Sequence, residues 1–158
     1  MIEKNKLIKT LYEVSIVDCQ DLWFWRNEEL TRNMAKNSNF ISWDTHKLWF
    51  ETCMKSKYVN IYIAKDIKGY KLGMCRFEIE KNLNFAEISI SIYSAKRGRS
   101  LSANLLKMSI QKFEEKKNCI LKATIKKVNI ASIKCFTKCG FTLTSQDKKF
   151  NYYECDRT

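Results

Sequence analysis

Polar and apolar residues alternate along three successive stretches of the chain: YVNIYIAK (58–65), KLGMCRFEIE (71–80) and NFAEISISIY (84–93). A period of two is the pattern of a β-strand that buries one face. In the third stretch the alternation separates a polar face from an apolar face, with Glu87, Ser89, Ser91 and Tyr93 on one and Ala86, Ile88, Ile90 and Ile92 on the other. The connections are short enough for hairpins, so the pattern predicts an antiparallel meander.

Apolar residues recur at helical spacing in two longer stretches. One follows Ser42, a residue type that caps helices, and the other runs from Ser100 to about Lys117 with Leu101 and Leu105 on its apolar face. Asp18 can cap an earlier helix in the same way. We therefore expect at least three helices, each with one face against a sheet.

The rest of the chain completes an α+β pattern. A strand followed by a helix is expected over residues 6–27, with an irregular turn at 27–32. The stretch ILKATIKK (120–127) reads as a strand, and a shorter helix at 129–138 is ended by Gly140. Two strands over 141–156 close the chain, so we expect a mixed sheet with helices against it.

Length and composition indicate one domain. The 158 residues are 45% hydrophobic, and no linker or repeat divides them, so we expect a single domain over residues 1–158. No apolar run resembles a signal peptide or is long enough to span a bilayer, which predicts a cytoplasmic protein without a membrane partner. The seven cysteines are scattered and odd in number, with a single histidine, so we expect free thiols and no metal.

The formal net charge of +12 raises the question of a nucleic-acid partner. The basic residues are dispersed over the predicted strands, helices and turns, and no single block of them forms a patch. Dispersion weakens an RNA-binding interpretation, and no nucleic-acid partner is expected. A basic surface also raises the encounter rate with small polyanionic ligands, so the charge is compatible with either class of partner.

The turn that opens the helix at residue 100 is a candidate anion site. It is basic and rich in small residues, in the order Arg97, Gly98, Arg99, Ser100, Leu101, Ser102 and Ala103. The first N–H groups of a helix lack intrahelical partners, and the helix dipole adds positive potential there. The turn predicts a phosphate-bearing ligand; the alternative is an ordinary capped helix start on a solvated turn.

The order of strand, anion turn, helix, strand and Asn-led helix, then Gly140 and Phe141, resembles the acetyl-CoA-binding core of the GCN5-related N-acetyltransferases (GNAT). The resemblance implies an α+β GNAT fold, with a mixed, mostly antiparallel central sheet of about seven strands flanked by about four helices. It also implies an acyltransferase that uses acetyl-CoA and no metal. Direct transfer to an amine in one ternary complex is the reaction that such a protein performs.

The same resemblance assigns cofactor contacts. In the family, the strand before the turn diverges from the next strand, and its backbone binds the pantetheine arm; Ile90, Ser91 and Ile92 match those positions. The pyrophosphate is expected on residues 97–103, where Ser100 and Ser102 stand at places that are usually glycine. Further contacts are implied along the second signature, VNIASIKCFTKCGF (128–141), at Asn129, Ser132, Phe136 and Lys138.

Two positions depart from the family pattern. Thr124 stands where many members have a glutamate base, and Phe136 stands where many have a tyrosine that protonates the leaving thiolate. Phenylalanine cannot donate a proton. Tyr93, Ser132 or a water could take the acid role; otherwise the thiolate leaves unprotonated, or the domain is catalytically impaired.

The first half of the chain is similar to the nucleotide-sugar N-acetyltransferases of the pseudaminic-acid pathway, through the segment DLWFWRN (21–27), an Ile-Ser pair and the following histidine. This implies a UDP-linked 4-amino-dideoxy sugar as acceptor, bound by Arg26, Asn27, Arg32, His46 and Trp49. Guanidinium groups suit a diphosphate. The alternative is that Arg26 and Asn27 cap the first helix.

His46 is the side chain with an ordinary pKa near neutrality, so it is a candidate base for the acceptor ammonium. A structural histidine within a helix is the alternative. For the whole chain, the alternatives to a sugar acetyltransferase are a protein N-terminal or small-amine acetyltransferase, a non-catalytic CoA-binding domain, and a basic nucleic-acid-binding domain. We expect a monomer or homodimer.

Overall fold

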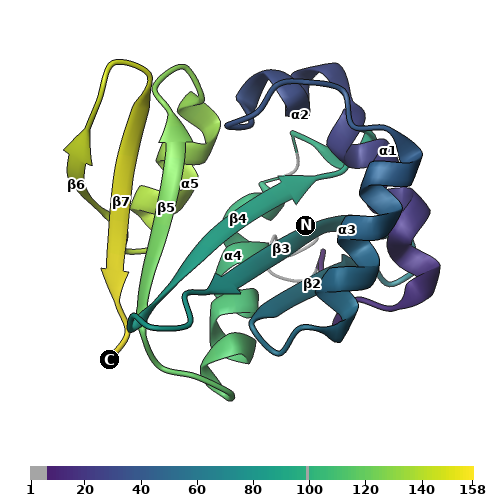
Figure 1. The fold of residues 1–158 in the computed structure, drawn as a ribbon, viewed down its shortest axis with the longest axis horizontal. Helices are drawn as coiled ribbons and strands as arrows, with labels where there is room; N and C mark the ends of the chain where they lie inside the picture. The colour runs from purple at the N-terminus through teal and green to yellow at the C-terminus, as the bar shows by residue number, and fades with distance from the viewer. Residues whose placement is uncertain (1–6, 99) are drawn as a thin grey trace.

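The computed structural model describes residues 7–98 and 100–158 and contains one seven-stranded sheet in the order β1-β2-β3-β4-β5-β7-β6 (Figure 1). Neighbouring strands are antiparallel, except that β4 and β5 are parallel. The predicted mixed, mostly antiparallel sheet is confirmed. The strands are β1 (Thr10–Glu13), β2 (Val59–Lys65), β3 (Lys71–Ile79), β4 (Phe85–Ile92), β5 (Ile120–Lys126), β6 (Thr142–Gln146) and β7 (Phe150–Asp156).

The helices lie on both sides of this sheet. Helices α4 and α5 lie behind the sheet in Figure 1, whereas α1, α2 and α3 lie along its other side and its upper edge. Two one-turn 3₁₀ helices, η2 and η3, precede α1 and α4. The bounds are α1 (Cys19–Asn27), α2 (Glu29–Met34), α3 (Trp43–Lys55), α4 (Leu101–Glu114), α5 (Ile130–Lys138), η2 (Ile16–Asp18) and η3 (Ser94–Lys96).

Helix α2 corrects the expected irregular turn at 27–32. It has no buried residue, so no apolar periodicity in the sequence marks it. It begins directly after Glu28, whose carboxylate pairs with Arg97 at 2.6 Å, and Arg97 also donates to the hydroxyl of Thr31 at 2.8 Å. A contact between residues nearly seventy positions apart in the chain thus anchors this helix. Such a contact leaves no local sequence pattern from which the helix could be predicted.

The two faces of the sheet bury separate cores. The larger core lies under α4 and α5 and includes Phe77, Leu105 and Phe113, with the rings of Phe77 and Phe113 stacked at 4.2 Å. The smaller core lies under α1 and α3 and includes Trp25 and Phe50. We call the α1–α3 side the acceptor face. All seven cysteines are free thiols, distributed over both cores and their edges.

The central wedge of the sheet lies between β4 and β5. These strands pair over three residues only, from Phe85 opposite Ile120 to Glu87 opposite Lys122. Beyond this point β4 continues to Ile92 and β5 to Lys126 while the strands diverge, as Figure 1 shows. The divergence exposes the β5-facing edge of β4 in the middle of the sheet, where backbone groups are normally paired.

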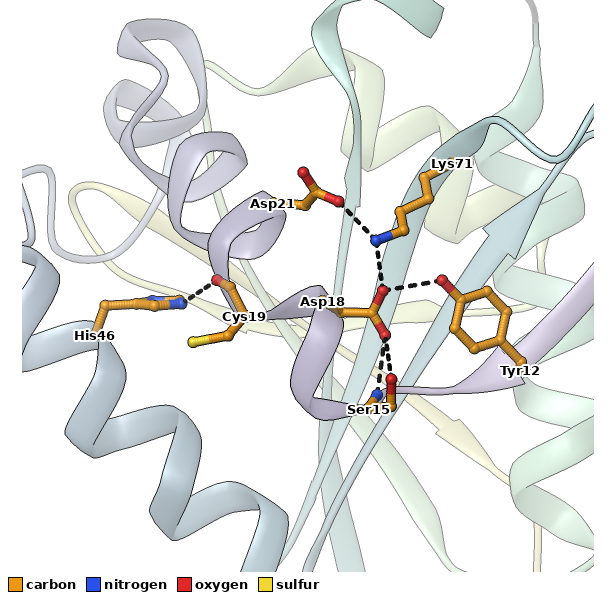
Figure 2. A network of polar contacts seen from close by, with 7 residues as sticks. All are labelled: Tyr12, Ser15, Asp18, Cys19, Asp21, His46 and Lys71. Atoms are coloured by element: carbon orange, nitrogen blue, oxygen red, sulfur yellow. Dashed lines mark hydrogen bonds and ion pairs between the residues drawn. The ribbon is translucent and has the colours of Figure 1, made fainter.

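A buried ion-pair network fastens the N-terminal segment to the sheet (Figure 2). Asp18 is 1% exposed and accepts hydrogen bonds from the Tyr12 hydroxyl at 3.0 Å and the Ser15 N–H at 2.9 Å. Lys71, at the start of β3, reaches both Asp18 and Asp21 at 2.6 Å. Burial alone would raise the pKa of Asp18, but the bonds from Lys71, Ser15 and Tyr12 hold it below its ordinary value.

We predict that Asp18→Asn lowers the free energy of unfolding by about 3 kcal/mol at pH 7, because it breaks a buried ion pair. The lowered pKa of Asp18 gives a stabilisation that is present above the unfolded pKa and is lost as the pH falls through the folded pKa. The variant should therefore lose less stability than the wild type on acidification below about pH 4. Urea unfolding at several pH values measures both effects. Asp44→Asn, which alters an exposed carboxylate on α3, is the control; an equal cost in both variants would contradict the assignment.

Ser100 begins α4 in a left-handed conformation, with φ 57° and ψ 34°, and its side chain makes no capping hydrogen bond. This is the conformation that glycine adopts without strain. We predict that Ser100→Gly raises the free energy of unfolding by about 0.5–1 kcal/mol. Ser102→Gly, the same change inside the first turn of the helix, should lower it by about 0.5–1 kcal/mol. Thermal and urea unfolding of both variants measure the changes in the free energy of unfolding. If the two changes had the same sign, the left-handed conformation assigned to Ser100 would be refuted.

Candidate functional site

The wedge presents unpaired backbone groups along β4. The Tyr93 N–H donates to Leu72 on β3 at 2.9 Å, and β4 pairs with β3 without a register shift. Because successive backbone groups of a strand point to opposite edges, those of Ile90 and Ile92 point into the wedge. The backbone groups of Ser91 point to β3, where Ser91 is opposite Met74. Of the three residues that the sequence assigns to the pantetheine arm, two therefore turn their backbone groups into the wedge, and Ser91 has its side chain on the acceptor face.

The turn after β4 has the geometry of an anion site. Gly98 has φ 76° and Ser100 has φ 57°, which reverses the chain so that the first turn of α4 begins at the open end of the wedge. Ser100 leaves the first helical N–H groups uncapped, and these belong to residues 101–103. Ser102 and Ala103 are half-buried there. Arg99 lies outside the described residues.

Arg97 does not point freely to a ligand, because it is bound to α2 through Glu28 and Thr31. Its role is to hold α2 next to the turn. A groove separates the two and is lined by Glu28, Glu29, Leu30, Asn33, Ser94 and Arg97. The expected phosphate contact of Arg97 thus competes with an ion pair that is present in this structure.

Helix α5 borders the wedge on the α4 side. Asn129 caps it, since its Oδ1 accepts from the Ser132 N–H at 3.2 Å. Ser132 is half-buried and Lys138 is exposed. Phe136 is 2% exposed, with its ring edge against Phe141 at 5.0 Å. The ring that replaces the family's tyrosine is therefore a core side chain.

Tyr93 directly follows β4, and its ring stacks on Trp25 of α1 at 5.7 Å, on the acceptor face. It keeps 36% of its surface exposed. Its ring is therefore held in place against α1, and its role as the acid stays a prediction.

His46 has a structural environment. It is 3% exposed, and its Nε2–H donates to the Cys19 carbonyl at 2.8 Å, which links α3 to α1 (Figure 2). Its ring lies against Trp43, Trp49 and Phe50. Burial lowers the pKa of His46, and the bond to Cys19 opposes this only in part. The Nε2 atom of the imidazole is thus engaged in a bond between two helices.

Asn27 is also engaged in holding the chain. Its side-chain amide donates to the Ile41 carbonyl and accepts from the Ile41 N–H, both at 2.8 Å. Trp23 donates to the same carbonyl at 2.8 Å. These bonds shape the segment between α2 and α3, so Asn27 acts indirectly on the acceptor face. Trp49 lies beneath the Arg76 guanidinium, 5.4 Å from its ring centre.

Two charged residues that sequence reasoning passed over lie on the acceptor face of the sheet. Glu87 is the acidic residue of β4, on the face opposite the α4 core, and it pairs with Lys36 from the segment after α2. Arg76 of β3 is opposite Ser89 of β4 in the register. The alternation in each strand already put them on the polar face, but only the sheet order brings them beside the wedge.

Within residues 7–98 and 100–158, no three His, Cys, Asp or Glu side chains are grouped so as to hold a metal ion. Over the same residues, no helix has both the length and the apolar character needed to cross a membrane.

Comparison with solved structures finds the same fold in acetyltransferases at low identity. A spermidine N-acetyltransferase from Vibrio cholerae, in complex with CoA and spermine, has a TM-score of 0.84 at 12% identity, covering 94% of this chain and 95% of that one. A putative acetyltransferase from Salmonella typhimurium, with its cofactor acetyl-CoA, has a TM-score of 0.78 at 18% identity and covers 94% of each chain. A domain from Methanocaldococcus jannaschii has a TM-score of 0.77 at 20% identity, covering 92% and 96%.

Comparison with curated proteins finds no match. A family model described as an acetyltransferase (GNAT) domain matches residues 10–142, from β1 to the start of β6. The match includes the wedge, the turn and α5, which are the parts that the sequence had assigned to the cofactor. The chain therefore belongs to the acetyltransferase (GNAT) domain family and is, by class, an acetyl-CoA-dependent N-acetyltransferase.

Proposed function

We propose that this protein transfers the acetyl group of acetyl-CoA directly to a primary amine of a small acceptor, in one ternary complex. The observation that carries the proposal is the unpaired edge of β4 beside an uncapped helix start. The β4 edge suits the amides of the pantetheine arm. The helix start suits the pyrophosphate, because its free N–H groups and the helix dipole favour an anion.

The cofactor would span the wedge from the turn to the middle of β4. Its pyrophosphate would lie on the amides of residues 98–103, and its pantetheine arm beside Ile90 and Ile92. The expected contacts of Asn129, Ser132, Phe136 and Lys138 would then come from α5, with Asn129 and Phe136 acting through the shape of that helix. A backbone N–H of β4 would polarise the thioester carbonyl.

The chemical step needs a base on the acceptor face and a proton for the leaving thiolate. The amine nitrogen attacks the carbonyl carbon, a C–N bond forms, the C–S bond breaks, and CoA leaves as a thiolate. We assign the proton from the amine to Glu87, directly or through water, since this carboxylate lies on the acceptor face of β4. Tyr93 or Ser132 would protonate the thiolate. His46 is better explained as a tie between α1 and α3.

Two acceptor classes are candidates for this site. The Vibrio cholerae structure was solved with spermine, which is in line with a small-amine acceptor. The names of the three similar structures described above mention no nucleotide sugar, so the pseudaminic-acid assignment gains no support from them. One observation nevertheless favours a nucleotide-linked amino sugar as a second candidate: Arg26 and Arg76 bring positive charge to the acceptor face.

We predict that Ser102→Glu weakens acetyl-CoA binding by at least about tenfold, because a carboxylate at the uncapped helix start repels the pyrophosphate. The same change should leave stability equal or higher, since an acidic residue in the first turn favours a helix. Gln111→Glu, on the exposed face of α4, adds the same charge elsewhere and is the control. Calorimetry at low salt measures binding. Equal affinity in both variants would refute the assigned pyrophosphate site.

We predict thiol release from acetyl-CoA in the presence of a small primary amine, and that Glu87→Gln lowers kcat by about 10²-fold with little change in acetyl-CoA affinity. His46→Gln should keep most of the activity, because an amide N–H can still donate to the Cys19 carbonyl. A panel of polyamines, amino sugars, nucleotide-linked amino sugars and peptides supplies the acceptors.

The outcomes separate the alternatives. Preference for peptides would replace the small-amine assignment with a protein acetyltransferase. Acetyl-CoA binding without transfer to any amine would favour a non-catalytic domain. A loss of kcat in His46→Gln equal to that in Glu87→Gln would return the base role to His46.

A further inference from the structure

A cluster of three arginines, from α1, α2 and β3, lies on the acceptor face. Arg26 of α1 is bound through Nη2 to the Asn37 carbonyl at 2.7 Å, whereas its Nη1 is buried and has no hydrogen-bond partner among the described residues. The charges of Arg76 and Arg32 both act on it. Burial, and then these two charges, lower the pKa of Arg26. We call Arg26, Arg32 and Arg76 the arginine cluster.

The cluster is undercompensated by the protein. Arg76 pairs with Glu78 at 3.0 Å, and its guanidinium lies over the ring of Trp49. Arg32 donates from Nε to the Asn27 carbonyl at 3.0 Å, which is a neutral partner. Among the described residues, the three positive guanidinium groups of the cluster are therefore paired with one carboxylate only, that of Glu78. A buried guanidinium N–H without a partner is costly, and an anion bound at this point would remove that cost.

The position of the cluster connects it to the amine site. Arg76 of β3 is opposite Ser89 of β4. Ser89 is two residues from Glu87, and both lie in β4, the strand that borders the wedge. The Asn37 carbonyl that holds Arg26 follows directly after Lys36, which pairs with Glu87. The arginine cluster and the proposed base are therefore joined through neighbouring residues of one segment. A ligand bound at the cluster would extend toward the wedge.

We propose that the acceptor carries a phosphate group, and that Arg26 and Arg76 bind it, with Arg32 adding to the field. This rests on the proposed amine acetylation and deepens it by naming the acceptor class. An excess of about two positive charges matches a phosphate, which carries about −1.5 to −2 at pH 7, better than a single carboxylate. A guanidinium fork also fits phosphate oxygens. Polyamines, which are cations, are disfavoured by the same cluster.

Direct binding is the first test. The protein is saturated with CoA, so that the turn before α4 is occupied, and inorganic phosphate or pyrophosphate is added at constant ionic strength. We expect a rise in thermal midpoint and measurable binding by calorimetry. Arg26→Gln and Arg76→Gln should each weaken binding by about 10- to 100-fold, as for the loss of a charge-assisted hydrogen bond. Arg157→Gln, which alters an arginine paired with Glu114 on the other side of the sheet, should not.

Kinetics with matched acceptors is the second test. Each amine is compared with its phosphorylated counterpart, for example glucosamine with glucosamine 6-phosphate, together with spermidine and a UDP-linked amino sugar. We expect a higher kcat/KM for phosphorylated acceptors. Arg26→Gln and Arg76→Gln should remove that preference mainly by raising the KM of the phosphorylated acceptors, whereas Arg157→Gln should keep the preference. The kinetics with the UDP-linked amino sugar show whether the cluster prefers a diphosphate bridge or a terminal phosphate.

The possible failures are distinguishable. Acetylation of spermidine or other unphosphorylated amines with no preference for phosphorylated acceptors, unchanged in Arg26→Gln and Arg76→Gln, would overturn the phosphate site and leave amine acetylation standing. Cluster-dependent phosphate binding without transfer to any amine would overturn the acetylation and leave the anion site standing. Unchanged phosphate binding in both cluster variants would show that the anion binds elsewhere and would overturn the proposal.

Discussion

The site depends on the point at which β4 and β5 stop pairing. Parallel strands in the middle of a sheet normally satisfy each other's backbone along their whole length. Here the pairing ends after Glu87 and Lys122, so the remaining edge of β4 is free while β3 still supports it. Antiparallel pairing of β5 with β7 over seven residues stabilises the other side of the wedge. The sheet can thus open in its centre without losing the support of either half.

The elements around the wedge would contribute differently to the proposed binding. The α4 side supplies an uncapped helix start, for which Ser100 accepts a left-handed conformation. The acceptor face supplies charge, through Glu87 and the arginine cluster. Helix α2 is held next to the turn by Arg97, so one arginine connects the cofactor side to the acceptor side.

Phe136 and Thr124 stand where the family pattern has a tyrosine and a glutamate. Packing explains the first departure, and strand geometry explains the second. Phe136 lies in the core against Phe141, where a hydroxyl would need a buried partner. Thr124 belongs to β5, on the far side of the wedge, and is opposite Tyr152. Glu87, on β4, puts a carboxylate on the acceptor face from the other strand. A base on β4 would thus compensate for the threonine on β5.

The sequence by itself determined the strands, the main helices, the turn before α4 and the family, because each depends on local periodicity, capping or the residue types of a short turn. It did not determine α2, which a distant ion pair with Arg97 anchors. Nor could it determine the surroundings of His46, since a helical histidine has the same local pattern whether it faces a substrate or the Cys19 carbonyl. Arg76 and Glu87 were likewise visible only as polar positions of two strands. The tertiary structure decided these points, because strand order and helix packing determine which distant side chains share one space.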